Sequence, residues 1–162
     1  MNKIFWIFLV VLCQTYLLKS QHELLPKGFT IQERQLMDDY LSNYLISSDI
    51  ITAPPEFYVR TMAEWEEIQA LTIAWEGFSP ILTEIVRYSV DQCKVIIACE
   101  NPNEVQDYLE DNNVETSNVD YLDVSTNSIW MRDYGQNTIY KNDVDSIYLV
   151  DWIYNRPRPQ DD

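Results

Sequence analysis

The 162-residue chain carries 26 acidic residues against 11 lysines and arginines, which gives a formal net charge of −15 at pH 7. So negative a surface repels nucleic acids and anionic membranes, and this excludes both as partners. Cationic small molecules or peptides are favoured, although solubility alone accounts for most of these charges. The length predicts one domain that is large enough to bury a real core.

Residues 1–20 are typical of a secretory signal peptide. Lys3 precedes an uninterrupted apolar run over residues 4–12, and the small residue Ser20 ends the segment. The run is too short to cross a bilayer comfortably, which takes about 20 apolar residues. We therefore predict export to the periplasm, outer surface or extracellular space, with no stable membrane insertion after cleavage. An uncleaved anchor is the alternative.

The first half of the remaining chain predicts a helix, a connector and a strand. Residues 21–30 indicate an unstructured lead-in, and the apolar period over 31–46 predicts a helix. A proline-punctuated connector covers residues 52–60. A strand is expected over residues 70–75.

A second helix is predicted after this strand. Ser79 is its expected N-cap, Pro80 stands at its first helical position, and Ile81 and Ile85 lie on one face.

Strands then dominate the second half. Residues 94–100 predict a buried strand, and Asn101 with Pro102 predicts the capped start of another amphipathic helix. Three further strands are expected over residues 119–124, 136–141 and 146–154. Alternating strands and helices indicate the α/β class. The late strands lack intervening helices, which departs from a simple doubly wound sheet.

The cysteines do not predict a disulfide or a metal site. Cys13 leaves with the signal peptide, and Cys93 and Cys99 bracket one predicted strand. An extended span of about 20 Å separates them, so they cannot bond to each other. The only histidine is His22, and no Cys/His spacing suits zinc. No metal and no cofactor is expected.

The stretch "WMRDYG" at residues 130–135 has the chemistry of a cation clamp. The Asp133 carboxylate can accept two hydrogen bonds from a planar guanidinium, and Trp130 offers it a π-face. Gly135 permits a close approach or a positive-φ turn directly afterwards. The alternative is a surface salt bridge of Arg132 with Asp133 beside a core tryptophan, and composition alone favours that alternative.

The C-terminal stretch "NRPRP" at residues 155–159 presents two arginines on stiff backbone. A proline fixes its own φ and pushes the preceding residue towards extended geometry. In so acidic a chain, Arg156 and Arg158 could form a carboxylate receptor. A solvated linker whose arginines balance Asp161 and Asp162 is an equally good interpretation.

Three motifs in order carry a family resemblance: "AEWEEIQALTIAW", "IWMRDYG" and "VDWIYNRPRP". Together they resemble the agmatine deiminase and bacterial-type peptidylarginine deiminase family of guanidine-modifying enzymes. The resemblance implies an α/β fold, part of a five-fold pseudo-symmetric α/β-propeller (pentein-like) that is incomplete in this chain. It divides the chain into the signal peptide 1–20, a helical lead-in and connector 21–58, and the N-terminal portion of the catalytic domain 59–162.

The resemblance also implies a reaction and a substrate site. In that family a cysteine attacks the guanidinium carbon, ammonia leaves, and water releases a ureido product. Carried over by motif, Trp130 would pack on the guanidinium and Asp133 would bind its nitrogens, with Arg132 orienting the loop. The "NRPRP" stretch is similar to the peptidylarginine branch, in which Arg156 and Arg158 would bind the carboxylate of a C-terminal arginine.

Two alternatives stay open for the function. One is an agmatine deiminase of putrescine biosynthesis, although agmatine carries no carboxylate for the arginine pair. The other is a non-catalytic binder of cationic ligands. Two departures from the family pattern weaken the match, because Gln136 and Glu76 stand where proline is common.

The resemblance places the nucleophilic cysteine and a catalytic histidine in the family's C-terminal half. No histidine follows His22, and Cys93 and Cys99 stand at the wrong place in the motif order. We therefore expect no catalytic residue in this chain, which resembles the N-terminal part of a longer enzyme. Such a fragment should be inactive alone, and it should expose unpaired sheet edges and associate. Its oligomeric state and natural substrate are not predicted.

Overall fold

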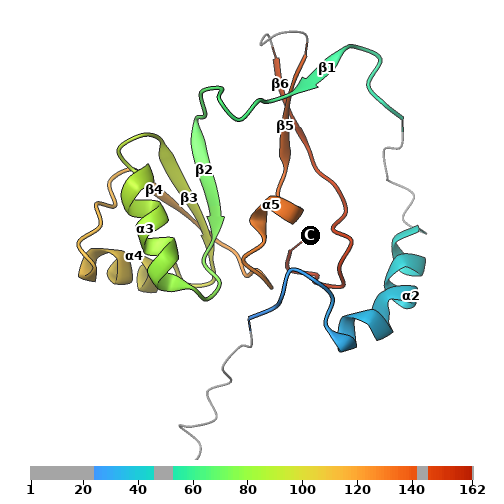
Figure 1. The fold of residues 1–162 in the computed structure, drawn as a ribbon, viewed down its shortest axis with the longest axis horizontal. Coiled ribbons are helices and arrows are strands. Elements are labelled where there is room, and N and C mark those ends of the chain that lie inside the picture. Colours follow the sequence, from blue (N-terminus) through green and yellow to red (C-terminus); the bar gives the residue numbers. More distant parts are fainter. Residues whose placement is uncertain (1–23, 46–52, 142–145, 162) are drawn as a thin grey trace, which may run out of the picture.

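The computed structural model describes residues 24–45, 53–141 and 146–161 (Figure 1). The predicted signal peptide lies outside these residues. Within them the chain forms a mixed α/β fold, as predicted, with two separate three-stranded sheets. Its elements, in chain order, are α2 (Ile31–Leu45), β1 (Val59–Thr61), β2 (Ala70–Ala74), α3 (Ser79–Ser89), β3 (Lys94–Cys99), α4 (Pro102–Asp111), β4 (Val119–Asp123), α5 (Met131–Tyr134), β5 (Asn137–Lys141) and β6 (Ser146–Val150).

The first sheet is parallel and holds the main core. Its strand order is β2-β3-β4, and α3 and α4 provide the two crossovers beside it (Figure 1). The central strand β3 is the most apolar, because neighbours cover it on both edges and a helix layer covers one face. Val95 and Ile97 of β3 are fully buried, as are Val86 of α3 and Leu109 of α4. The predicted strands in this region and the α4 start are confirmed.

Helix α4 begins as the sequence predicts. The Asn101 side chain accepts a hydrogen bond from the Glu104 N–H at 3.4 Å, and Pro102 occupies the first turn, where no N–H partner is needed.

Helix α3 differs from the prediction at its start. Its N-cap is Phe78 in a left-handed conformation (φ 46°), so the prediction of Ser79 as N-cap is wrong. Gly77 and Phe78 both have positive φ, and this tight turn from β2 lets the helix begin one residue earlier. Ile81 and Ile85 share a face but are exposed, because the buried face carries Leu82, Thr83 and Val86 instead.

The second sheet is antiparallel, with strand order β1-β5-β6. Strand β6 stops at Val150, so the prediction of a strand through residue 154 is too long. The physical reason is the register of the two strands. Val150 pairs with Asn137, the first residue of β5, so the residues after Val150 have no β5 partner to pair with. Ile147 and Leu149 of β6 are 53% and 64% exposed, which leaves an apolar strand at the edge of the sheet.

The N-terminal segment packs against the C-terminal end of the chain. Residues 24–30 contain no helix or strand, as predicted, and α2 follows them. A capping box starts this helix: the Glu33 carboxylate accepts from the Thr30 N–H at 2.6 Å, and the Thr30 hydroxyl accepts from the Glu33 N–H at 3.1 Å. The Tyr40 hydroxyl then donates to the Tyr154 carbonyl at 2.7 Å. Both ends of the described chain therefore meet beside α5 (Figure 1).

Candidate functional site

The residues of the "WMRDYG" stretch lie at the short helix α5, which a network of hydrogen bonds anchors. The Asp161 carboxylate accepts from the N–H groups of Asn127 and Ser128 and from the Ser128 hydroxyl, at 2.6–3.0 Å. The Tyr134 hydroxyl donates to the Ser128 carbonyl at 2.7 Å. Burial and the Asp161 charge raise the pKa of Tyr134 above its usual range, so Tyr134 remains a donor. The loop before α5 is therefore held from both sides.

Gly135 ends α5 through a close approach and not through a positive φ. Its φ is −69°, in the ordinary range for any residue. A Cβ at this position would lie 2.6 Å from the Met131 carbonyl oxygen, so only glycine fits without a backbone shift.

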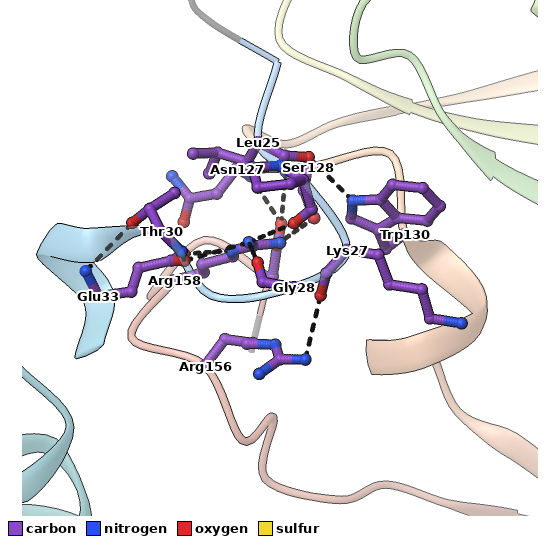
Figure 2. A network of polar contacts seen from close by, with 12 residues as sticks. Leu25, Lys27, Gly28, Thr30, Glu33, Asn127, Ser128, Trp130, Arg156 and Arg158 are labelled. Atoms are coloured by element: carbon purple, nitrogen blue, oxygen red, sulfur yellow. Dashed lines mark hydrogen bonds and ion pairs between the residues drawn. The ribbon is translucent and has the colours of Figure 1, made fainter.

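Trp130 is half-buried at the N-cap of α5. Its indole N–H donates to the Leu25 carbonyl at 2.9 Å, and this contact joins the N-terminal segment to α5 (Figure 2). With its only donor occupied, the indole can offer a ligand only the faces and edges of its rings.

Asp133 is accessible, with 29% of its side chain exposed. Its Oδ1 lies 3.6 Å from the ammonium of Lys27, a residue whose side chain is 67% exposed. Arg132 contacts Glu64 instead, at 3.7 Å, and both side chains are at least 90% exposed. The alternative salt bridge between Arg132 and Asp133 is therefore wrong, since each residue pairs elsewhere.

Arg156 lies against the N-terminal segment. Its guanidinium carbon is 3.7 Å from the centre of the Phe29 ring, a cation–π contact. Its Nη2 donates to the Lys27 carbonyl at 3.0 Å (Figure 2). The Arg158 N–H donates to the Arg156 carbonyl at 2.8 Å, so the backbone between the two arginines turns tightly.

Arg158 is buried, with a relative exposure of 1%. Its Nε donates to the Glu33 carboxylate at 2.6 Å, and its Nη2 donates to the carbonyls of Pro26 and Gly28 at 2.7 and 3.4 Å (Figure 2). Burial alone would lower the pKa of Arg158, but the hydrogen bond and charge of Glu33 raise it. Burial would likewise raise the pKa of Glu33, yet hydrogen bonds from Arg158 and Thr30 lower it below 4.5. The pair is charged at neutral pH.

An open cleft of about 330 Å³ lies between the N-terminal segment, α5 and the chain after β6. It brings together two of the four predicted binding residues, Asp133 and Arg156, whereas Trp130 and Arg158 do not line it. Both of the latter contact the segment that forms its wall. The lining residues are Lys27, Asp133, Trp152, Ile153, Tyr154, Asn155 and Arg156.

Sequence reasoning missed Lys27 and Glu33 as parts of this site. The pattern Thr30-x-x-Glu33 is a capping-box signature, and it could have predicted where α2 starts. Nothing local indicates that Lys27 lies beside Asp133, because more than 100 residues separate the two in sequence.

Neither Cys93 nor Cys99, the two cysteines that the structure describes, lines the cleft. Cys93 and Cys99 are free, as predicted. Burial raises the pKa of the Cys99 thiol, and the negative charge of Asp123 raises it further. A raised pKa keeps Cys99 protonated and a poor nucleophile. Among residues 24–45, 53–141 and 146–161, no cluster of metal-ligating side chains is found. No helix in the same ranges is long and apolar enough to cross a membrane.

Several solved structures resemble this fold. A candidate arginine deiminase from Porphyromonas gingivalis matches with 13% identity and a TM-score of 0.50, over 58% of this chain and 30% of that chain. Agmatine deiminase of C. jejuni matches with 20% identity and a TM-score of 0.48, over 59% of this chain and 32% of that one. A cysteine-to-serine variant of that enzyme with substrate bound gives 20% identity and a TM-score of 0.49, over 59% and 30%. The chain thus spans about a third of the length of these proteins.

A family model provides the assignment. The model of the Porphyromonas-type peptidyl-arginine deiminases matches residues 60–157, which include α5, Asp133 and Arg156 and amount to more than half of the sequence. This chain therefore belongs to the Porphyromonas-type peptidyl-arginine deiminase family.

Proposed function

We propose that this chain provides the substrate-binding part of an exported deiminase that acts on C-terminal arginine of peptides. The reaction hydrolyses the guanidinium to a ureido group and releases ammonia. One observation carries the proposal: Asp133 and Arg156, from two separate motifs, line a single cleft. An arginine with a free carboxylate has a cation at one end and an anion at the other, which suits one acidic and one basic partner.

Asp133 is the proposed partner of the guanidinium. Its partly exposed carboxylate can accept two parallel hydrogen bonds from the planar cation. The Lys27 ammonium must leave Asp133 when the guanidinium arrives, and this costs little because the present contact is long and the lysine is mostly exposed. We assign Trp130 the stacking contact, through its ring and not through its occupied N–H.

Arg156 is the proposed direct partner of the substrate carboxylate, since it lines the cleft. Arg158 approaches the same N-terminal turn from the buried side, and its Nη1 has no hydrogen-bond acceptor within the described residues. A buried donor without an acceptor is costly, so a bound anion could relieve it. We therefore keep Arg158 in the proposed carboxylate site, through the two N–H groups of its Nη1.

The nucleophile must come from outside this cleft. Cys99 is buried and protonated, Cys93 lines a different part of the molecule, and no histidine follows His22. We propose that the chain holds substrate but does not turn it over alone. We further propose that its two open sheets form part of a larger five-fold propeller, in keeping with its match to about a third of longer relatives.

A titration of the 15N-labelled protein, followed by NMR, tests the binding proposal at the millimolar affinities expected of a partial site. The ligands are Nα-acetyl-arginine, its amide, and agmatine. We expect the indole N–H signals of Trp130 and Trp152, identified by Trp→Phe variants, to shift, with Nα-acetyl-arginine binding most tightly. Tighter binding of agmatine would favour the agmatine deiminase alternative. Absence of shifts with all three ligands would overturn the proposal.

A further inference from the structure

The N-terminal wall of the cleft is fixed by the predicted site residues themselves. Four successive carbonyls, from Leu25 to Gly28, accept hydrogen bonds from Trp130, Arg158, Arg156 and Arg158 in turn (Figure 2). This segment lies outside the residues that match the family model. The backbone of this segment therefore forms part of the site in this chain, although the family motifs do not include it.

Lys27 lies in the middle of this fixed segment and has an exposed side-chain charge. Its carbonyl is held by Arg156 at 3.0 Å, while its side chain is 67% exposed. The ammonium lies 3.6 Å from Asp133, longer than a good charge-assisted hydrogen bond of about 2.8 Å. A short rearrangement of the flexible stem is enough to move this charge within the cleft.

The charge of the cleft is opposite in sign to that of the protein. The charged residues among its lining are Lys27, Asp133 and Arg156, so two cations face one anion. The sequence as a whole has a net charge of −15. When a ligand guanidinium neutralises Asp133, neither Lys27 nor Arg156 has a negative partner in the cleft. A carboxylate on the same ligand can provide that partner.

We propose that Lys27 is a specificity-determining residue that, together with Arg156, selects arginine ligands with a free carboxylate. The inference rests on the function proposed above. Arg158 cannot fill this role fully, because its Nε and Nη2 are committed to Glu33 and to backbone carbonyls. Lys27 also disfavours agmatine, whose second positive charge meets two cations and no compensating anion.

The experiment compares the Kd of Nα-acetyl-arginine with that of its amide, by the same NMR titration. The selectivity is the ratio of the amide Kd to the acid Kd. In Lys27→Met we expect this ratio to fall by about 1.5-fold to fivefold, the range for a solvent-exposed charge pair. Lys27→Arg should retain the ratio of the wild type. The difference between wild type and Lys27→Met should shrink at 1 M salt, at which the Debye length is about 3 Å.

Lys94→Met is the matched control. It removes the same charge from β3, where Lys94 pairs with Asp120 at 2.7 Å, and Lys94 does not line the cleft. Its ratio should equal that of the wild type. If Lys27→Met binds both ligands more tightly with an unchanged ratio, Lys27 is an internal competitor for Asp133 and the inference fails. If the wild type itself shows no preference for the acid, the proposed function fails first.

Discussion

Arg158 and Glu33 form a buried ion pair across 125 residues of sequence, with Nε and Oε1 2.6 Å apart. The side chains are 1% and 9% exposed. The same Glu33 carboxylate caps helix α2 through the Thr30 N–H. One carboxylate therefore starts a helix and fixes it to the C-terminal arginine motif, which places the N-terminal segment against the cleft.

Glu33→Gln should destabilise the fold by about 3–5 kcal/mol, because it leaves the Arg158 guanidinium buried with a neutral partner. Urea denaturation followed by tryptophan fluorescence measures the change. Glu33→Gln combined with Arg158→Gln should cost less than the sum of the two single changes, since the pair couples them. Arg132→Ala is the control: this side chain is 93% exposed, so the change should stay within about 0.5 kcal/mol.

Acid should weaken the same contact. The pKa of Glu33 is lowered on folding below its usual 4.5, so its charged form stabilises the native state. This contribution is fully present above pH 4.5 and is lost as the pH falls below that value towards the folded pKa. Unfolding free energies measured between pH 7 and pH 3 should fall less steeply in Glu33→Gln than in the wild type. Parallel curves for the two proteins would contradict the assignment.

Asp133→Asn should weaken binding of arginine ligands about tenfold or more, because it removes a charge-assisted acceptor for the guanidinium. The loss should be similar for Nα-acetyl-arginine, its amide and agmatine, since all three carry the same cationic group. Arg156→Ala should instead weaken only the ligand with a carboxylate. Asp120→Asn, on the distant strand β4, provides the control for a lost acidic charge. Equal affinities of Asp133→Asn and wild type would exclude Asp133 from the site.

Gly135→Ala should destabilise the protein by about 1–3 kcal/mol, because the new Cβ would lie 2.6 Å from the Met131 carbonyl. The effect is steric, since the φ of Gly135 suits any residue. Gly28→Ala is the matched control, because no atom lies within 4 Å of a Cβ placed there. Thermal unfolding should separate the two variants clearly. Equal melting temperatures would show that α5 shifts to make room.

Strand β6 should promote association of the isolated chain. Ile147 and Leu149 expose an apolar face on a strand that pairs on one side with β5 and has no described partner on the other. Sedimentation velocity at micromolar concentration should show species larger than the monomer. Leu149→Lys should shift the population towards monomer, because a lysine on an edge strand opposes pairing. A wild type that is monomeric throughout would contradict this expectation.

The local sequence correctly predicted the three strands of the parallel sheet. Strand β3 is a continuous apolar run, and such runs indicate strands that neighbours and helices cover. Asn101 and Pro102 predicted the start of α4, because a cap and a missing N–H act within one turn. The sequence did not indicate which side of α3 is buried, because Ile81 and Ile85 look as apolar as Leu82 and Val86 but face solvent. Periodicity marks an apolar stripe, whereas the position of the sheet decides which edge of it is buried.

The motifs alone indicated Asp133 and Arg156 as possible ligand contacts, because the charge and hydrogen-bonding groups of a side chain follow from its residue type. Tertiary structure distinguished Arg156, on the cleft, from Arg158, buried against Glu33, although the two differ little in sequence context. It also brought Lys27 to Asp133, which no local pattern could indicate. Residue types and short-range periodicity determine which elements and which chemistry are available. Which charges meet depends on contacts between distant segments, and only the folded chain brings those segments together.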